Sequence, residues 1–387
     1  MKTQPQTLLV LLLLLAGAPP TLGQAFNSGS DGSFGPINLT TSDLALDLPP
    51  DGVIHATTVS VGAGRTLRFR PNALNTPVFL LATGDVIIDG TVDISGERGS
   101  TAAGGRGGPG GFDGGMPGSV GTPPGDGHGP GAGRAGQDNR TAEGAGQGVY
   151  ASALALGEST RHGTPYGSAL LIPLLGGSGG GGTEGTPGKG GGGGGGAILI
   201  ASNTRIQVNG RINARGAEWI GSAVNGGSGG AIRLVAPVVG GPGTLDVRGS
   251  DGFSSAHGRI RVDTLDRSGL NFSFQPTAGA AVGSLLLVQP TPLPRLDLVE
   301  VAGTAVPEGS GPVQITLPFG APAAQTVKVR ARDFGQTVPL RLVLTPDSGA
   351  SRSYDFEINN AAANPAEAMV NVEFPANTAT RVAVWTR

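Results

Sequence analysis

The sequence contains no cysteine and few charged residues. Without cysteine, neither a disulfide framework nor an anchor attached through a lipid-modified cysteine can form, and a structural zinc centre is not expected. Asp, Glu, Lys and Arg together make up 14% of the 387 residues, and the net charge is −2. Nucleic acid and anionic membranes, which bind to dense basic regions, are therefore not expected as partners.

Long apolar runs are scarce as well. One run, Leu8–Ala16, is too short to span a bilayer comfortably; it follows Lys2 and precedes the small residues of Ala18–Gly23. This order is typical of a secretory signal peptide over residues 1–23, with a buried apolar helix as the alternative. We therefore expect an exported bacterial protein, secreted or at the cell surface, whose mature chain has no transmembrane segment.

Glycine is the residue in excess: there are 71, concentrated at about residues 97–196. Lys189 does not belong to a phosphate-binding loop, because Thr183 replaces the first glycine of that motif and Gly190 replaces its Ser or Thr. Gly104–Gly115 instead repeats two glycines and one larger residue. This period predicts extended helices of three residues per turn that pack closely together, with a flexible linker as the alternative.

Three segments flanking this insert share one pattern, in which two alternating apolar residues lie between glycines six positions apart. Each segment follows an apolar strand, and a unit of about twenty residues is the length of one coil of a parallel β-helix. The pattern predicts a right-handed parallel β-helix over residues 24–288, interrupted by the insert. A β-sandwich of hairpins is the alternative, although no two-residue Asn-Gly or Asp-Gly turn joins the paired strands. The three segments are Gly90–Gly96, Gly210–Gly216 and Gly243–Gly249.

A proline-rich linker, residues 289–295, precedes the C-terminal part of the chain. Residues 296–387 contain short alternating segments at the spacing of an immunoglobulin-like β-sandwich, which would act as a spacer or binding module. The whole chain is thus predicted to be all-β. The segments expected as strands in this part are Leu296–Val301, Val313–Leu317, Thr326–Ala331, Val338–Thr345, Ser353–Ile358, Ala368–Phe374 and Thr380–Trp385.

The sequence resembles a recurrent group of bacterial secreted, glycine-rich proteins of predicted parallel β-helix, pectin-lyase-like type. The resemblance covers residues 26–262 and implies the fold and export. That group has no established activity, so the resemblance implies no catalytic or ligand-binding residue, and the C-terminal part lies outside it. The segments that carry the resemblance are Phe26–Gly35, Asn75–Gly99, Gly107–Gly115, Tyr166–Gly182 and Gly191–Ser202.

Candidate catalytic residues come from the glycine-bounded repeats. Asp93, Asn213 and Asp246 occupy the same place in the three repeats, so we expect them to stack into an exposed ladder on one outer face. Polysaccharide lyases and hydrolases with this fold place acidic and basic residues on such faces. The alternative is that these side chains only stabilise turns. The catalytic candidates are Asp93, Asp246, Arg248 and His128, whose Gly-His-Gly context resembles that of polygalacturonases; Asp85, Asp89, Arg205, Arg211 and Arg215 are nearby in the repeats.

Calcium is the one cofactor for which the sequence offers candidate ligands. Asn27 and Asp31 provide side-chain oxygens ahead of an Asp-Gly step, as in a calcium loop. The twelfth position of such a loop would be Asn38 in place of an acidic residue, so the match is partial. A simple Asp-Gly turn is the alternative.

Taken together, these patterns favour an exported surface or extracellular-matrix protein that is not an enzyme. We expect a structural, adhesive or carbohydrate-binding role, with polysaccharides or other cell-surface components as partners. A β-helix polysaccharide lyase or glycoside hydrolase is the alternative. Carboxylates with a basic residue in an exposed groove would favour the enzyme, and a flat or glycine-lined flank would favour the structural role.

Overall fold

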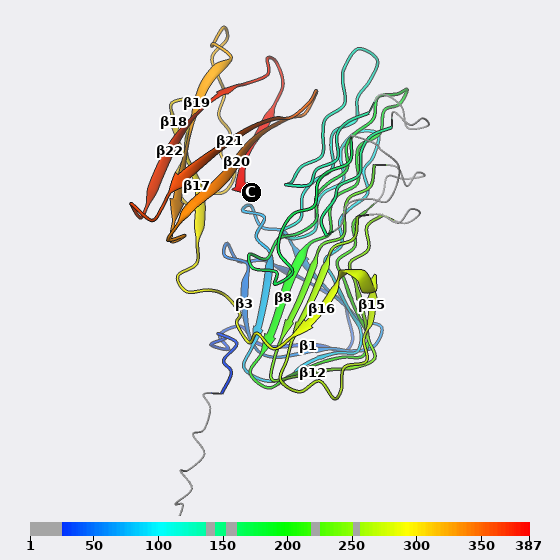
Figure 1. Ribbon diagram of the computed structural model, residues 1–387. Helices are drawn as coiled ribbons and strands as arrows, with labels where there is room; N and C mark the ends of the chain where they lie inside the picture. Colours follow the sequence, from blue (N-terminus) through cyan, green and yellow to red (C-terminus); the bar gives the residue numbers. More distant parts are fainter. Residues whose placement is uncertain (1–24, 137–143, 152–160, 218–224, 251–255) are drawn as a thin grey trace, which may run out of the picture.

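The structure is a computed structural model that describes residues 25–136, 144–151, 161–217, 225–250 and 256–387 (Figure 1). The predicted signal peptide, residues 1–23, lies outside the described residues. Within the described residues the regular structure is nearly all β; there is no α-helix, and a single 3-10 turn, η1, spans Thr277–Gly279. The prediction of an all-β protein is therefore confirmed.

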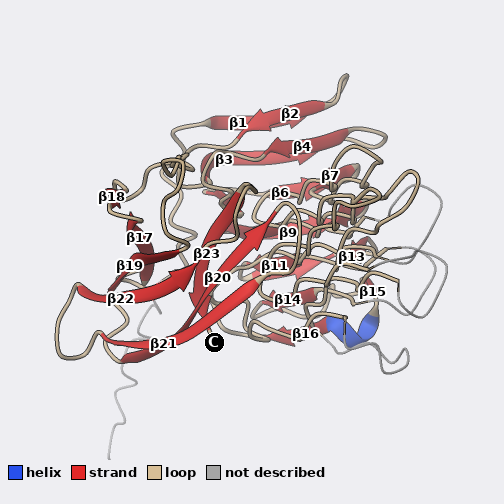
Figure 2. Ribbon diagram, turned by 90° about the horizontal axis from the view of Figure 1, so that it is seen from above, coloured by secondary structure: helices blue, strands red, loops and turns tan. Residues whose placement is uncertain are grey.

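A large parallel sheet, strongly curled like a half-barrel, forms the first part of the molecule (Figures 1 and 2). It has ten strands, in the order β12-β9-β6-β3-β5-β8-β11-β14-β16 with β1 beside β3, and a six-stranded parallel sheet, β15-β13-β10-β7-β4-β2, accompanies it. The strands are β1 (Gly35–Leu39), β2 (Leu44–Asp47), β3 (Val53–Val61), β4 (Thr66–Arg70), β5 (Val78–Ala82), β6 (Val86–Ile88), β7 (Thr91–Asp93), β8 (Ala197–Ser202), β9 (Arg205–Val208), β10 (Arg211–Asn213), β11 (Ala231–Val235), β12 (Val238–Gly240), β13 (Thr244–Asp246), β14 (Arg259–Asp263), β15 (Ser273–Gln275) and β16 (Ala280–Gly283).

Successive repeats of the sequence stack on one another in parallel. Strands β7, β10 and β13, one from each glycine-bounded repeat, pair so that Val92, Ile212 and Leu245 stand in register. These side chains are fully buried and belong to one apolar core shared by both sheets. The alternation of apolar residues thus fills the interior one layer per repeat, as expected for side chains with a period of two.

The glycines that bound the repeats are required by close contact between layers. A Cβ on Gly210 would lie 1.9 Å from the carbonyl oxygen of Gly90 in the layer below, and one on Gly243 would lie 2.7 Å from that of Gly210. Both distances are shorter than a Cβ can tolerate. The recurring glycines of the sequence pattern therefore mark the corners at which backbone rests on backbone.

The glycine-rich insert leaves the stack after β7 and returns at β8. Within it, segment 190–197 is extended and surrounded by other extended segments of the chain. Every third N–H group of this segment donates to the same neighbouring segment, with donor–acceptor distances of 2.7 to 3.0 Å. Gly190, Gly193 and Gly196 donate to segment 94–100. Gly191 and Gly194 donate to segment 112–115, and Gly192 and Gly195 donate to segment 225–228. The three-residue period expected from Gly104–Gly115 is thus present in the hydrogen bonding.

Segment 190–197 and the extended segments around it form what we call the glycine bundle. Side chains are excluded from the centre of this bundle. A Cβ on Gly193 would lie 2.0 Å from the carbonyl oxygen of Arg106, and one on Gly192 would lie 1.9 Å from that of Ala217. Larger residues lie at the margin, where Tyr150 and Tyr166 stack and join an apolar cluster over β8 and β11. The described part of the insert is therefore a hydrogen-bonded assembly that only glycine allows, in contrast to the linker alternative.

The C-terminal part consists of two antiparallel sheets that enclose a second apolar core. Six of the seven expected strands are present. The prediction of a strand at Val313–Leu317 is wrong, because that segment pairs with no neighbouring strand and lies between Pro312 and Pro318, which lack an N–H group. The sheets are β18-β17-β19-β22 and β21-β20-β23, formed by β17 (Arg295–Val301), β18 (Thr304–Ala305), β19 (Ala324–Arg332), β20 (Thr337–Pro346), β21 (Arg352–Asn359), β22 (Ala366–Glu373) and β23 (Thr380–Thr386).

The C-terminal sheets lie beside the glycine-rich insert (Figure 1). Arg381 on β23 donates two hydrogen bonds to Asp113 Oδ2, each of 3.0 Å, and the Ser351 N–H donates to Asp126 Oδ2 at 2.9 Å. Just before the predicted linker, the buried Arg233 donates to the carbonyl oxygens of Leu287 and Val288. The contacts of Asp113 and Asp126 thus join the C-terminal sheets to the insert, whereas those of Arg233 hold the last residues of the first part.

Candidate functional site

The predicted ladder is present on the outer face of the six-stranded sheet. Asp93, Asn213 and Asp246 stand in register on β7, β10 and β13, with Arg68 of β4 before them and Gln275 of β15 after them. They form one column because each side chain points away from the core between two inward apolar neighbours. The parallel pairing of the strands therefore brings these five polar residues together.

The Asp93 carboxylate is held by several neighbours within this column. It accepts hydrogen bonds from the Ser95 hydroxyl at 2.6 Å and from Asn213 Nδ2 at 3.2 Å, and it forms an ion pair with Arg68 at 3.3 Å. Its side chain is 19% exposed. Both carboxylate oxygens are therefore engaged, and little of the group faces solvent.

Asp246 is fully buried, so the prediction that it is exposed is wrong. Arg248 donates to its two carboxylate oxygens at 3.0 and 2.7 Å, and Arg211 from the preceding layer donates at 3.2 Å. The expected direction of the side chains holds, since Leu245 and Val247 are buried in the core. Asp246 points outward between them, but the two long arginine side chains, each just over 40% exposed, cover it.

His128 lies elsewhere in the molecule. It is buried in the glycine-rich insert near Asp113 and Arg381, in the contact with the C-terminal sheets. Burial, with the positive charge of Arg381 as a second cause, lowers the pKa of His128 to about 4. This histidine is therefore neutral at pH 7 and is not brought together with Asp93, Asp246 or Arg248.

The two calcium candidates cap turns. Asn27 Oδ1 accepts the Gly29 N–H at 2.8 Å, and Asp31 Oδ1 accepts the Ser33 N–H at 2.9 Å, with His55 at 3.7 Å from the same carboxylate. Among the residues that the structure describes, no group of three or more His, Asp or Glu side chains is placed to hold a metal ion. The geometry is that of Asx turns.

The other polar residues that the repeats suggested lie in two places in the structure. Asp85 binds Arg205 at 2.8 Å and Thr204 at 2.7 Å, and these hydrogen bonds and the charge of Arg205 lower the pKa of its carboxyl group. Asp89 accepts a hydrogen bond from Asn209 at 2.6 Å. These pairs are exposed at corners of the curled sheet, whereas Arg211 and Arg215 lie on the face of the ladder.

A polar pocket of about 180 Å³ adjoins the ladder. Four of the residues that line it carry polar side chains: Ser95, Arg98, Asn213 and Arg215. Hydrogen bonds between Gly96 and Arg215 and between Gly216 and Arg248 continue the parallel register beyond the ends of the strands, so Ser95, Arg215 and Arg248 follow one another from layer to layer. Ser95 was not among the predicted site residues, although its place two residues after Asp93 is a signal that identifies it; Arg98 follows no such pattern.

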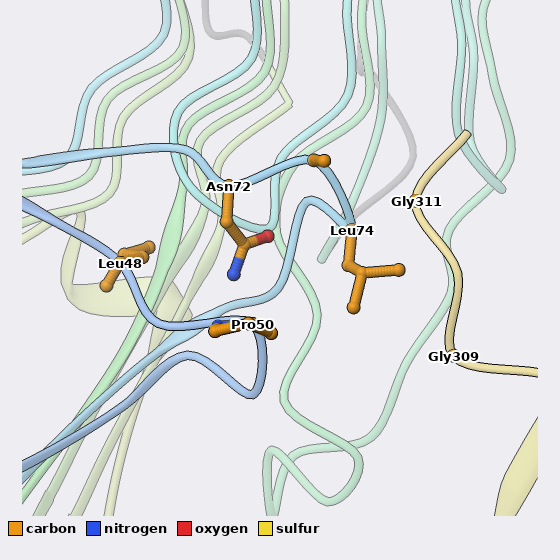
Figure 3. A pocket seen from close by; sticks show the side chains of 7 residues that line it. Leu48, Pro50, Asn72, Leu74, Gly309 and Gly311 are labelled. Atoms are coloured by element: carbon orange, nitrogen blue, oxygen red, sulfur yellow. The ribbon is translucent and has the colours of Figure 1, made fainter.

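A second pocket, of about 240 Å³, lies where the first layers of the stack meet a loop of the C-terminal part (Figure 3). Leu48, Pro50, Asn72 and Leu74 line one side and Gly309 and Gly311 the other (Figure 3). Asn72 is the one lining side chain in this described region with polar atoms, and it donates to the Pro49 carbonyl and the Thr76 hydroxyl. With no ionisable group in its described lining, this pocket offers no acid–base chemistry.

No protein-family model matches the sequence, and neither a characterised relative nor a solved structure with significant similarity was found. Within the part of the chain that the structure describes, there is no helix with the length and apolar character needed to cross a membrane.

Proposed function

We propose that the protein is an exported surface or extracellular-matrix protein with a structural, adhesive or carbohydrate-binding role. In this proposal the curled parallel sheets form a right-handed parallel β-helix, and the C-terminal sheets form an immunoglobulin-like sandwich. The in-register stacking of Val92, Ile212 and Leu245 supports the first assignment. Two antiparallel sheets around one apolar core support the second.

The state of the outward carboxylates carries the argument against catalysis. A general acid at neutral pH needs a raised pKa, and a general base needs an accessible lone pair. Asp246 is buried beneath Arg211 and Arg248, and the oxygens of Asp93 are engaged by Ser95, Asn213 and Arg68. These contacts occupy the carboxylate oxygens of both groups, which suits a structural ladder.

Export is supported by the N-terminal sequence and by the resemblance to secreted glycine-rich proteins. The proposed signal peptide, residues 1–23, has a lysine, an apolar run and a small-residue end in the expected order. Mass spectrometry of protein collected from the culture medium or the cell surface tests this proposal. The expected N-terminus is Gln24 or Phe26, and an intact Met1 would contradict it.

A polysaccharide lyase or glycoside hydrolase is the second candidate, and one observation favours it. Aspartates and arginines of adjacent layers share one outer face with a polar pocket. A lyase could use such arginines to neutralise an acidic sugar. It would also need a free base, and the carboxylates of the ladder, those of Asp93 and Asp246, are engaged by arginine.

Two measurements on the purified mature protein separate the candidates. A glycan array reports binding, and an assay for new reducing ends reports cleavage of any polysaccharide that is bound. Binding without release of reducing ends supports the proposed role. Release that disappears in the Asp93→Asn variant would instead establish the enzyme.

A further inference from the structure

The outermost strands of the six-stranded parallel sheet each have one free edge. Among the described strands, β2 pairs only with β4 at one end of the stack, and β15 pairs only with β13 at the other. Figure 2 shows β2 and β15 at opposite ends of the stack, with the C-terminal sheets beside it. The outer edges of β2 and β15 therefore have backbone groups that no other described strand pairs with.

The apolar core is open at the same two ends. Two columns of inward side chains run through the stack, and their inner members are fully buried. At the first end Leu44 is 38% exposed, whereas at the last end Phe274 is half-buried and Val282 is 39% exposed. The core therefore meets solvent at both ends. The columns are Leu44, Leu67, Val92, Ile212, Leu245 and Phe274, and Leu80, Ile200, Leu234, Val262 and Val282.

The usual protection of a sheet edge is missing from β2 and β15. Proteins protect such edges with proline, with inward-pointing charges or with a covering helix. Neither strand contains proline, and their inward residues, Leu44, Leu46 and Phe274, are apolar. The described residues form no α-helix that covers either end. Stacked repeats without polar end layers tend to add a further layer.

From these features we infer that copies of the protein associate end to end, with β15 of one copy pairing in parallel with β2 of the next. In this pairing Leu44 follows Phe274 and Ala45 follows Gln275, at the layer spacing of about 4.8 Å. Both ends belong to one sheet whose strands all run in the same direction, so the last layer of one copy matches the first layer of another. A second copy is therefore the partner that continues the core.

The association is expected to be open-ended. The two ends differ, so the contact is heterologous, and every added copy leaves a free β2 edge and a free β15 edge for the next one. The product is a filament that grows along the stack. This inference goes beyond the proposed function, because it depends on the geometry of the stack and on no glycan ligand.

Pairing of two like ends fits the structure less well. Two copies of β15 that both keep Phe274 towards the core must run antiparallel, because a two-fold axis relates them. That contact would end at a dimer and leave the edge of β2 and the exposed Leu44 uncovered. The parallel contact instead covers both ends.

The first test is sedimentation velocity of the mature full-length protein over a wide range of concentrations. The wild type is expected to form species larger than a dimer that grow with concentration. Leu44→Asp blocks the first end and Val282→Asp the last end, and each is expected to weaken self-association by about tenfold or more. Leu170→Asp, at a similarly exposed leucine of the insert, is the matched control and is expected to assemble as the wild type does.

Mixing the two blocked variants tests the direction of the contact. Each variant keeps one intact end, and the two intact ends are complementary. An equimolar mixture is therefore expected to form dimers of one copy each and nothing larger. An unfolded variant could not restore this dimer, so the mixture also separates lost contact from lost folding.

A disulfide provides a second test, because the chain contains no cysteine. Ala45 and Gln275 lie five layers apart within one copy, about 24 Å at 4.8 Å per layer, which is too far for a disulfide. In the proposed contact they are neighbours. Under mild oxidation the Ala45→Cys/Gln275→Cys double variant is expected to give a ladder of linked oligomers, whereas Ala45→Cys alone gives at most a dimer.

Three results would overturn the inference. The first is a wild type that stays monomeric at every concentration, which would leave these edges to some other partner or to none. The second is dimer formation by Leu44→Asp or Val282→Asp alone, which would show contact between like ends. The third is a double cysteine variant that assembles but gives no ladder, which would place the contact away from β2 and β15. None of these results bears on export or glycan binding, so the proposed function is tested separately.

Discussion

Arg248 holds Asp246, its neighbour but one in the sequence, through two hydrogen bonds, 3.0 Å from Nε to Oδ1 and 2.7 Å from Nη2 to Oδ2. The aspartate is fully buried and the arginine is partly exposed. The arginine side chain therefore covers the carboxylate. Asp246 thus points outward from the sheet, yet it forms an ion pair that solvent hardly reaches.

The Asp246→Ala variant is expected to lower the free energy of unfolding by about 2 kcal/mol, because four hydrogen bonds to the carboxylate disappear and a small cavity forms. Denaturant unfolding of the two proteins measures this difference. The control is Asp85→Ala, which removes an exposed ion pair with Arg205 and is expected to cost about 0.5 kcal/mol. Equal losses in the two variants would contradict the burial of Asp246.

His128 is expected to make stability depend on pH. Its pKa is about 4 in the folded protein and 6.5 without burial, so the unfolded chain takes up the proton first as the pH falls. The stability that comes from keeping His128 neutral is therefore complete above pH 6.5 and is lost as the pH falls towards 4, by a few kcal/mol.

The measurement is the difference in unfolding free energy between pH 7.5 and pH 4.5, compared between the wild type and His128→Gln. The comparison cancels the contributions of the carboxylates, which are common to both proteins. The variant is expected to lose less stability on acidification than the wild type. An identical loss in both proteins would show that His128 is accessible to protons in the folded state.

Gly193→Ala is expected to cost about 3 kcal/mol or more, because its Cβ would lie 2.0 Å from the Arg106 carbonyl oxygen in the centre of the glycine bundle. Gly269→Ala is the matched control, since the nearest atom, Cα of Gly240, would be 3.5 Å away. That substitution is expected to change stability by less than about 1 kcal/mol. Thermal melts of both variants provide the check, and similar melting temperatures would mean that the bundle is loosely packed.

Charge reversal at Arg381 is expected to weaken the contact between the C-terminal sheets and the glycine-rich insert. Arg381→Glu places two carboxylates together at Asp113, and cleavage of the linker, residues 289–295, should become faster. Cleavage is expected to begin there because Leu287 and Val288 are held by Arg233, whereas Pro292 and Leu293 are exposed. Limited proteolysis followed by mass spectrometry locates the first cut.

Lys328→Glu serves as the comparison in the proteolysis experiment. It reverses a charge and breaks the ion pair with Glu300 within the C-terminal sheets, away from Asp113. Its rate of linker cleavage is expected to match that of the wild type. A first cut at Asn209 or Pro242, between the repeats, would argue against two separately folded parts.

Local features of the sequence were sufficient to predict the stacking of the repeats. Glycines six positions apart mark backbone contacts such as that of Gly90 with Gly210, and alternation correctly directs Leu245 and Val247 inward. These features depend only on near neighbours in the chain. The shared place of Asp93, Asn213 and Asp246 in the repeats likewise correctly predicts that they form one column.

Contacts from distant segments could not be predicted in this way. The burial of Asp246 depends on Arg211 in the preceding layer, and the pocket depends on the path that brings Arg98 near Arg215. Alternation also suggested a strand at Val313–Leu317, but strand formation requires an unpaired partner edge that this segment does not meet. Direction of a side chain is thus a local property, while exposure and pairing are not.

The uniform backbone of segment 190–197 raises a problem of slippage during folding. Because its hydrogen bonds return to the same neighbour every third residue, a shift of the segment by three residues would restore the same kinds of bonds. The segment runs directly into β8, whose pairing with β5 and β11 places Ile198 and Ile200 in the core, so a shift by three residues would break that pairing. The apolar strand β8 therefore selects one alignment for the glycine segment that precedes it, and it guards against kinetically trapped misfolded states.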